Sequence, residues 1–474
     1  MDNSEIEKFR KEAYQIVDLI ADYYQNIEKY PVKSIVEPGD VYNRLPEYAP
    51  LEGESLTAIL EDFNKIVMPG ITHWQSPNFY AYFNANSSFP SLLGEFLTAG
   101  IGVNVFSWET SPAGTELESR VMEWLRFMTG LPDCFRGVIQ DTASTSTLVS
   151  LLSAREKYSN FQINKEGFKD NNKFRIYCSK EAHSSIEKDV RIAGFGADNL
   201  IKIKLNNDFS INLTDLETKI NDDIKNGYHP LAVISAIGTT GTTAIDNIDS
   251  IGDICIKYDI WHHVDAAHLG SALLCEENRH WIKGIEKADS FVFNPHKWMF
   301  TNFDFSAYYV QNTELLTKTF DILPEYLKIK TQNVINYKDW GIQLGRRFRA
   351  LKLWFVIRSF GVEGLKKKIR HHIKLAEWIE QQIVENDCME IMAPRIANLV
   401  CFRAIPHKNI GTELINDFNL KFLDKINSSG KAFLTKTKID GRIIIRMNIG
   451  QTYVEEKHIV STWQIITDSL RELM

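Results

Sequence analysis

The chain has 474 residues, of which 44% are hydrophobic and 24% are charged, and its formal net charge is -7. This composition is typical of a globular protein with one large and one smaller domain, and the negative charge disfavours nucleic acids and anionic membranes as main partners. The acidic N-terminus lacks the apolar run of a signal peptide, and no later segment has the length and hydrophobicity needed to span a bilayer. Six scattered cysteines without a C-x-x-C pair favour a reduced cytoplasm.

The first segment of the chain predicts an amphipathic helix. Ser4 and Glu7 have the spacing of a capping box, and Pro31 ends the pattern. The apolar residues at helical spacing are Ile6, Phe9, Ala13, Ile16, Val17, Ile20 and Ile27. Because these side chains share one face, we expect the helix to dock on another surface.

Between about residues 173 and 310, short β-rich runs alternate with helical runs. The predicted strands have the sequences FRIYCS, NLIKIKL, LAVISAIGTT, IWHHVDAA and SFVFN. The helices predicted before and between them span residues 114–129, 147–158, 184–193, 213–226 and 248–258. This alternation is typical of βαβ units, so the sequence predicts an α/β fold with a mostly parallel sheet.

The pattern changes after a long basic helix predicted at residues 365–384. A strand ANLVCFRA, a helix at residues 411–426, a hairpin turning at Asp440 and Gly441, and a last helix from about Val454 follow. These elements predict a separate small α+β domain.

Polar residues follow four of the predicted strands of the large domain. They are His183, Thr239, Thr240, Asp265, Asn294, His296 and Lys297. Ligands of open α/β sheets bind at the carboxyl ends of the strands, so these side chains are candidates for one site.

An amine, a carboxylate and an imidazole together suit the chemistry of pyridoxal phosphate. This cofactor forms a Schiff base with a lysine, and a carboxylate keeps its pyridine nitrogen protonated. Lys297 and Asp265 supply those groups, and a flat side chain such as His183 can stack on the ring. The small hydroxyl residues of QDTASTSTL precede a predicted helix, where backbone N–H groups suit a phosphate.

Each of these residues also has an ordinary structural interpretation. An aspartate after a strand is often a turn residue, a lone histidine is often hydrogen-bonded in the core, and a Ser/Thr cluster is often a helix cap. Lys297 alone could extend to solvent. The case for a site depends on the shared position of these residues after strands.

Other chemistries have weaker support in the sequence. There is no H-E-x-x-H or G-x-S-x-G motif, and GFGADN (residues 194–199) follows a helix and lacks the third glycine of a dinucleotide fingerprint, which favours a bend. The neighbours in His262–His263 and in His371–His372 cannot both face one metal from a regular element, so we interpret both pairs as structural.

Several long motifs resemble the group II pyridoxal-phosphate-dependent decarboxylases, most closely the aromatic-L-amino-acid decarboxylases. They are HWQSPNFYAYF, FSWETSPAGTELE, EAHSSIEK, HVDAAHLGSALL, NPHKW, NFDFSA and LGRRFRALKLWFVIRSFGVEGL. The resemblance implies an aspartate-aminotransferase-like fold, type I of the pyridoxal-phosphate enzymes. It also implies a homodimer with its active site at the interface. The expected parts are an N-terminal segment (residues 1–85) docking on the partner, a large cofactor domain (86–375) and a small C-terminal domain (376–474).

The resemblance assigns cofactor contacts to eight positions: Ala143, Ser144, His183, Thr240, Asp265, Asn294, His296 and Lys297. Lys297 matches the Schiff-base lysine, Asp265 the partner of the pyridinium nitrogen, and His183 the stacked imidazole. Asp141 and Thr145 depart from the residues that relatives often carry in the phosphate-binding turn.

The resemblance also assigns a substrate pocket, to Trp74, Tyr82, Phe83, Asn104, Phe106, Phe303 and Gly345. The aromatic members suit a flat aromatic substrate, and Gly345 stands where histidine-specific relatives tend to carry Ser. Asn84 and Ala85 replace a Pro-Thr of animal relatives. Asn104 replaces a common aliphatic residue, and its amide either favours a hydroxylated or indole substrate or hydrogen-bonds to backbone.

Two further residues bear on the reaction. Arg446 is a candidate carboxylate clamp of the kind that aminotransferases use, but its alternation with Ile443 and Ile445 favours a structural role on a hairpin. Tyr326 matches the mobile-loop tyrosine that protonates Cα, within a loop expected at residues 321–336. Relatives that form aldehydes tend to carry Phe at this tyrosine or Asn at the histidine equivalent to His183.

The resemblance therefore implies decarboxylation of an aromatic L-amino acid to its amine and CO₂. The alternatives are oxidative decarboxylation to an aldehyde, a decarboxylase for a non-aromatic amino acid, and a non-catalytic protein that keeps the fold.

Overall fold

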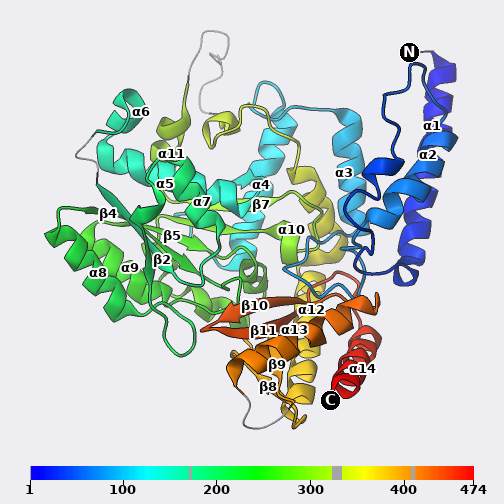
Figure 1. The fold of residues 1–474 in the computed structure, drawn as a ribbon. Coiled ribbons are helices and arrows are strands. Elements are labelled where there is room, and N and C mark those ends of the chain that lie inside the picture. Colours follow the sequence, from blue (N-terminus) through cyan, green and yellow to red (C-terminus); the bar gives the residue numbers. More distant parts are fainter. Residues whose placement is uncertain (1, 170–172, 323–333, 407–410) are drawn as a thin grey trace. The chain divides into compact units, whose positions relative to one another are not determined.

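The structure is a computed structural model that describes residues 2–169, 173–322, 334–406 and 411–474 (Figure 1). The chain divides into two compact units, each described here by itself. The large unit contains residues 85–380 and 391–401, and the second unit contains residues 1–84, 381–390 and 402–474. Docking of the N-terminal segment on a partner chain stays a prediction.

Helices account for much of both units. The α-helices are α1 (Asn3–Gln25), α2 (Leu56–Asp62), α3 (Phe89–Ile101), α4 (Pro112–Thr129), α5 (Ala143–Ser159), α6 (Gln162–Glu166), α7 (Ser185–Ile192), α8 (Leu213–Lys225), α9 (Ile248–Tyr258), α10 (Pro295–Trp298), α11 (Thr313–Phe320), α12 (Ala350–Val384), α13 (Thr412–Ser428) and α14 (Glu456–Leu473).

The strands form a seven-stranded and a four-stranded sheet. They are β1 (Arg136–Gln140), β2 (Phe174–Ser179), β3 (Leu200–Ile203), β4 (His229–Ala236), β5 (Trp261–Asp265), β6 (Ser290–Phe293), β7 (Ser306–Val310), β8 (Met389–Ile391), β9 (Leu399–Ala404), β10 (Thr435–Ile439) and β11 (Arg442–Asn448).

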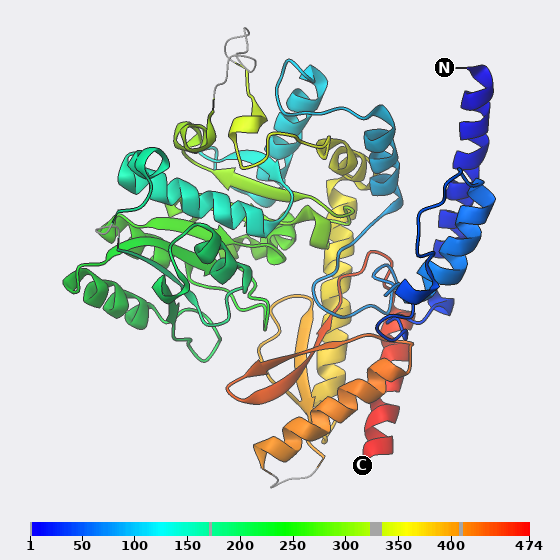
Figure 2. The ribbon, with the colours of Figure 1, turned by 45° about the horizontal axis from the view of Figure 1, so that its top comes forward.

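The large sheet has the order β1-β7-β6-β5-β4-β2-β3 and is mostly parallel, as the sequence predicted. Figure 2 shows the ribbon of the sheet and its helices in a second view. The pairs from β3 to β6 are all parallel, whereas β7 is antiparallel to both of its neighbours. Since β1 and β6 both run opposite to β7, they run in the same direction. The carboxyl ends of six strands therefore lie along one edge, here called the carboxyl edge.

Helices cover both faces of this sheet because successive strand side chains point to opposite faces. On β2, Ile176 and Cys178 pack in one core with residues of α5 and α7, such as Val149 and Val190. Tyr177 lies between them in sequence and packs in another core with residues of α8 and α9. The sheet is therefore buried on both sides, as parallel sheets generally are.

The N-terminal helix forms as predicted, but its cap differs. Asp2 is the N-cap and forms a capping box with Glu5, so the predicted box of Ser4 and Glu7 is wrong by two residues. The helix ends at Gln25, before Pro31. An aspartate cap serves as well as serine, and Asp2 accepts the backbone N–H of Ser4.

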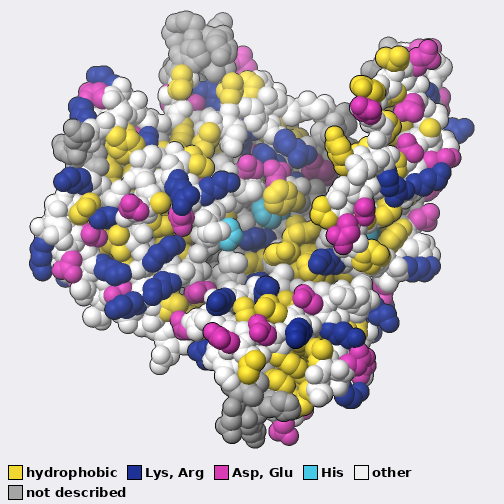
Figure 3. Space-filling view, in the orientation of Figure 1, with side chains coloured by type: hydrophobic (Ala, Val, Ile, Leu, Met, Phe, Trp, Pro, Cys, Tyr) yellow, Lys and Arg dark blue, Asp and Glu magenta, His cyan; other side chains and the backbone are white. Residues whose placement is uncertain are grey.

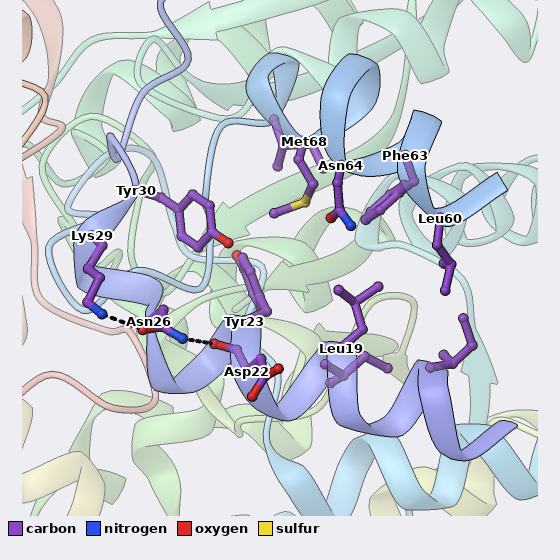
Figure 4. A pocket seen from close by; sticks show the side chains of 13 residues that line it. Leu19, Asp22, Tyr23, Asn26, Lys29, Tyr30, Leu60, Phe63, Asn64 and Met68 are labelled. Atoms are coloured by element: carbon purple, nitrogen blue, oxygen red, sulfur yellow. Dashed lines mark hydrogen bonds between the residues drawn. The ribbon is translucent and has the colours of Figure 1, made fainter. Parts of the chain in front are cut away.

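An apolar pocket of about 690 Å³ lies between α1 and α2 (Figure 4). The side chains of Leu19, Tyr23, Leu60, Phe63 and Met68 contribute to its wall. The same helix leaves Phe9 70% exposed and Val17 46% exposed. Thus only part of the predicted apolar face of α1 packs within its own unit.

Two predicted helices begin earlier than expected. α5 starts at Ala143 rather than at residue 147, so part of the TASTST cluster forms its first turn. α12 starts at Ala350 rather than at residue 365, and the backbone of Gly361 (φ 67°, ψ 165°) interrupts the helical geometry between the two starts. The hairpin of β10 and β11 turns at Asp440 and Gly441 as predicted.

Candidate functional site

The carboxyl edge brings together segments that are far apart in sequence. His183 follows β2, Thr240 follows β4, Asp265 ends β5, and Asn294 to Lys297 follow β6. β2, β4, β5 and β6 are consecutive neighbours in the sheet. Their polar residues therefore emerge side by side, as the alternating pattern of the sequence predicted.

Lys297 sits in α10, the short helix directly after β6. Its backbone N–H donates to the carbonyl of Asn294 at 2.9 Å, and its own carbonyl accepts the side-chain amide of Asn86. The next residue, Trp298, is fully buried and donates its indole N–H to Nδ1 of His372 at 2.9 Å. Contacts with Asn294, Asn86 and His372 thus fix the backbone at Lys297 and the residue that follows it.

The environment of Lys297 favours the neutral amine. Burial lowers the pKa of the Lys297 ammonium below its ordinary value, and the negative charge of Asp265 opposes this shift. A lowered pKa increases the fraction of neutral amine near neutral pH. The neutral amine is the form of lysine that attacks a carbonyl carbon.

Asp265 and His183 lie within electrostatic range of Lys297. Burial lowers the pKa of His183, while Asp265 raises it and Lys297 lowers it further. Nδ1 of His183 accepts the backbone N–H of Ser185 at 3.1 Å, and Oδ1 of Asp265 accepts the backbone N–H of Ala267 at 3.0 Å. Nδ1 of His183 also lies 2.8 Å from the hydroxyl of Ser185, so this end of the ring is enclosed although the residue as a whole is exposed. Figure 3 shows that histidine side chains reach the surface in this view.

Asn294 and His296, which both precede Lys297 in the chain, are buried. Oδ1 of Asn294 accepts the hydroxyl of Ser306 at 2.7 Å, and Nδ1 of His296 accepts the backbone N–H of Phe305 at 3.0 Å. Burial, reinforced by Lys297, lowers the pKa of His296 to about 3, so its ring is neutral. Both side chains connect α10 to the segment that enters β7.

The N-terminus of α5 follows β1 and therefore opens on the same edge. Ala143 and Ser144 are its first two residues, and the hydroxyl of Thr142 caps the backbone N–H of Thr145 at 3.3 Å. The N–H groups of the first turn and the helix dipole favour an anion here. Thr240 lies exposed beyond the end of β4.

The predicted substrate residues of the large unit fall in two groups. Phe303 is 56% exposed, and its ring centre lies 4.6 Å from that of His296. Asn104 instead accepts the backbone N–H of Arg346 through Oδ1 at 2.9 Å, which supports the backbone-bonding alternative for its amide. A Cβ on Gly345 would meet Nδ2 of Asn104 at 3.7 Å, ordinary contact, so this position has room for Ser. Phe106 is half-buried, and its carbonyl accepts the backbone N–H of Lys338.

The other predicted substrate residues belong to the second unit. Trp74 stacks on Tyr82 with ring centres 5.6 Å apart, and Tyr82 is half exposed. The ring of Phe83 lies 5.3 Å from the guanidinium of Arg446, whose Nη1 donates to Thr435 at 3.1 Å. These contacts agree with the structural interpretation of Arg446.

Asn84 has an internal role in the second unit as well. Its side chain donates to the carbonyl of Phe79 and accepts the amide of Asn448. Ala85 is half-buried at the first position of the large unit.

His262, His263 and His372 have hydrogen bonds to neighbouring side chains, in agreement with the structural interpretation of the histidine pairs. His262 contacts the hydroxyl of Ser235 at 2.7 Å, and His263 contacts those of Ser290 at 2.8 Å and Thr147 at 3.2 Å. The bend predicted at GFGADN also forms, with positive φ at Gly194 and Gly196. Tyr326 lies outside the described residues.

Sequence reasoning missed two features next to the site. Asn86 donates its backbone N–H to the carbonyl of His296 at 3.1 Å and its side-chain amide to the carbonyl of Lys297. Asp304, directly after Phe303, anchors a cluster of charged side chains. The signal for Asp304 was present: a single acid between the aromatic residues of NFDFSA.

The donor set at the carboxyl edge fits pyridoxal phosphate. It combines an amine of lowered pKa, a carboxylate beside it, an imidazole, and an anion-binding helix N-terminus. Together with a mostly parallel sheet covered by helices, this set defines a pyridoxal-phosphate enzyme of the α/β class.

The family comparison agrees. The sequence profile described as "Pyridoxal-dependent decarboxylase conserved domain" matches residues 38–405. The chain is 41% identical to a phenylacetaldehyde synthase of a Rosa hybrid cultivar, with 99% of this chain and 95% of the relative covered. It is likewise 41% identical to a tyrosine decarboxylase of Papaver somniferum, with 98% and 94% covered.

Solved structures are similar over the whole chain. Catharanthus roseus tryptophan decarboxylase in complex with L-tryptophan is 39% identical, with a TM-score of 0.94 and full coverage of both chains. This chain belongs to the pyridoxal-dependent decarboxylase family. It is a pyridoxal-phosphate-dependent decarboxylase, which confirms the predicted fold class, enzyme class and cofactor.

Proposed function

We propose that this enzyme converts an aromatic L-amino acid to the corresponding arylalkylamine and CO₂. The observation that carries the proposal is the grouping of Lys297, Asp265 and His183 at the carboxyl edge, where the charge of Asp265 acts on the pKa values of both Lys297 and His183. The aromatic preference draws support from Phe303 beside His296 and from relatives described as tyrosine and tryptophan decarboxylases.

Each site residue has a specific task in this proposal. Lys297 would hold the cofactor through Nζ, Asp265 would keep a proton on the pyridine nitrogen, and the ring of His183 would stack on the cofactor. The backbone N–H groups of Ala143 and Ser144 would receive the phosphate, with Thr240, Asn294 and His296 lining the site. Bound there, pyridoxal phosphate supplies an electron sink that weakens the bonds at the substrate Cα.

Loss of CO₂ requires that the substrate carboxylate is not strongly clamped. A cationic clamp would stabilise the charged ground state more than the transition state, in which that charge disperses. Arg446 is the clamp candidate, and its contacts with Thr435 and Phe83 support a structural role instead.

A panel of substrates tests the proposed function. Tryptophan, tyrosine, DOPA, phenylalanine and histidine are supplied separately, and CO₂ and amine are quantified in air. We expect one or more of the four amino acids other than histidine to give both products in equal amounts. CO₂ release from histidine alone would contradict the expected preference for a side chain with a benzene or indole ring. No CO₂ release from any of the five amino acids would contradict the proposed decarboxylation of aromatic amino acids.

A second candidate is oxidative decarboxylation to an aldehyde, because relatives from Rosa and Arabidopsis thaliana are described as phenylacetaldehyde synthases. We favour the amine because both His183 and Tyr326 are present. In the proposal, Tyr326 donates its phenolic proton to Cα, which general acid catalysis favours.

The variant Tyr326→Phe separates the two reactions, because it keeps the ring and removes the proton. We expect the ratio of amine to CO₂ to be near one in the wild type and to fall in the variant, with aldehyde and peroxide appearing. A ratio near one in the variant would exclude Tyr326 as the deciding donor. A wild-type ratio well below one would favour the aldehyde.

We further propose a homodimer in the cytoplasm, with the active site at the interface and α1 docked on the partner. The exposed Phe9 and Val17 of α1 support docking, and the buried thiols of Cys178, Cys255 and Cys275 suit a reducing compartment. No helix among the described residues is long and apolar enough to cross a membrane. Light scattering of Phe9→Asp against wild type tests the docking, with dissociation expected and an unchanged mass contradicting it.

A further inference from the structure

Hydrogen bonds hold most of the segment between α10 and β7 in place, whereas the ring of Phe303 is largely exposed. Asn302 donates its backbone N–H to Ser91 at 2.7 Å, Phe305 donates its backbone N–H to His296, and Ser306 donates its hydroxyl to Asn294. Phe303 lies between these anchors, and its side chain is 56% exposed. Its position therefore depends on the residues beside it.

Asp304 supplies the strongest of these anchors. Its two carboxylate oxygens accept Nε and Nη2 of Arg349 at 3.2 and 2.8 Å, the bidentate geometry in which an arginine fixes a carboxylate. Both side chains are only 15% exposed. Arg349 lies immediately before α12, so the pair connects the Phe303 segment to the start of that helix.

Three more charged groups surround the pair. Arg347 and Lys352 lie 3.5 and 4.0 Å from the Asp304 carboxylate, and Glu95 of α3 lies 3.2 Å from the buried amine of Lys352. Burial, reinforced by the two arginines and opposed by Asp304, lowers the pKa of Lys352 to about 7. Arg347 is half exposed, but Asp304, Arg349 and Lys352 are largely buried, and breaking a pair among these three leaves a buried charge uncompensated.

We propose that the Asp304–Arg349 pair is a positioning device that sets the Phe303 ring beside His296 and thereby controls affinity for the aromatic group of the substrate. The inference rests on the proposed function, since it takes Phe303 as part of the substrate pocket. Asp304 and Arg349 act through the ring and do not themselves touch the substrate. Loss of the pair frees the 303–304 backbone, and the ring then loses the fixed geometry that an aromatic contact requires.

A double-mutant cycle tests the inference. Phe303→Ala, Asp304→Asn and the double variant are prepared with bound pyridoxal phosphate. KM and kcat are measured for the preferred aromatic amino acid, and the Kd of phenethylamine, a probe for the arylalkylamine product, is measured by calorimetry. In the wild-type background we expect Asp304→Asn to raise Kd and KM about fivefold to tenfold, the range of one aromatic contact, with a smaller change in kcat. In the Phe303→Ala background it should change them less than about twofold.

A conservative variant and a matched control complete the cycle. Arg349→Lys keeps the charge but loses the bidentate geometry, so it should reproduce the effect even if Asp304→Asn folds poorly. Asp223→Asn is the control, because Asp223 pairs with Arg175 at 3.3 Å with side chains 15% and 14% exposed, and links α8 to β2. We expect this control to leave Kd unchanged.

Three results would overturn the inference. Equal effects of Asp304→Asn in both backgrounds would show that the pair acts independently of the ring. A control that raises Kd as much would show a general effect of losing a partly buried ion pair. An unchanged Kd in Phe303→Ala would show that the ring position does not matter, whereas amine formation by the wild type would still support the proposed function.

Discussion

Strand β5 places two kinds of polar residue only two positions apart. His262 and His263 lie in the middle of the strand, fully covered, and their rings hydrogen-bond to hydroxyl groups of Ser235, Ser290 and Thr147. Asp265 ends the same strand at the carboxyl edge and is within electrostatic range of Lys297 and His183. The strand thus contains both a pair of polar residues with a structural role and a polar residue that is a candidate for catalysis.

The difference lies in how each environment treats charge. Burial lowers the pKa values of His262 and His263 to about 3, so both rings stay neutral and serve only as hydrogen-bonding groups. At the edge, the charge of Asp265 raises the pKa values of Lys297 and His183 against the effect of burial, and charge partners of this kind are expected of reacting groups. Polarity alone therefore does not identify a site, whereas an acid at a strand end that acts on both an amine and an imidazole does.

The largest effect is expected at Lys297. Lys297→Ala removes the amine that would hold the cofactor, so turnover should fall almost to zero while the free energy of unfolding of the apoprotein stays near the wild-type value. Activity assays and urea denaturation measure the two quantities. Substantial turnover in this variant would place the chemistry elsewhere.

Asp265→Asn should have the next largest effect. The amide cannot keep the pyridine nitrogen protonated, so we expect kcat to fall on the order of 10²–10³, as when one aligned electrostatic group is lost from an active site. The absorbance of bound cofactor provides the control for binding. Near-normal kcat with the cofactor bound would refute the role of this carboxylate.

Asp189 shows what an acid does when it lies in the core behind the edge. It is 3% exposed on the inner face of α7, its Oδ2 has no hydrogen-bond partner among the described residues, and burial raises its pKa to about 7, with Asp265 adding to the shift and Lys188 opposing it. In the window from about pH 4 to pH 7 the unfolded carboxyl is ionised and the folded one is protonated. Wild-type stability should therefore fall as pH rises through this window.

Asp189→Asn removes this titration. We expect the variant to gain roughly 2–3 kcal/mol of unfolding free energy relative to wild type between pH 5 and pH 8, at about 1.4 kcal/mol per pH unit in the window. Urea denaturation at equal protein concentration and saturating cofactor measures it. A difference that does not change with pH would contradict the buried neutral acid.

The smallest effect on catalysis is expected in the middle of β5. His263→Leu leaves the hydroxyls of Ser290 and Thr147 without their imidazole partner, which should cost about 1–3 kcal/mol of stability. The kcat of the folded enzyme should remain within about twofold, because His263 is not among the groups that shift the pKa of Lys297 or His183. A loss of kcat comparable to that of Asp265→Asn would contradict the distinction between the structural histidines in the middle of β5 and the candidate catalytic residue at its carboxyl end.

Much of this arrangement could be predicted because strand and helix periods are local properties of the sequence. The runs ending at Asp265 and before Asn294 identify strand ends, and strand ends of a parallel sheet share one edge. The cap of α1 and the start of α5 were misplaced, because serine, threonine and charged residues suit both caps and first turns. The start of α12 was misplaced because Gly361 breaks the helical geometry, so the sequence prediction found only the part that follows this break.

The environment of buried charges could not be predicted in this way. Lys352 stands between Leu351 and Leu353 in the apolar first turns of α12, and Asp189 stands in the charged run EKD. The sequence does not show which residues pack against either side chain. Likewise, the choice between the two interpretations of Asn104 depended on the distance to the Arg346 backbone, a contact across more than two hundred residues.

Borohydride reduction of the enzyme with pyridoxal phosphate, followed by peptide mass mapping, tests the central claim most directly. Reduction fixes the cofactor on the lysine that holds it. A pyridoxyl group on the peptide containing Lys297 is the expected result. A label on another lysine, including the buried Lys352, with Lys297 unmodified, would contradict the assignment of the carboxyl edge as the active site.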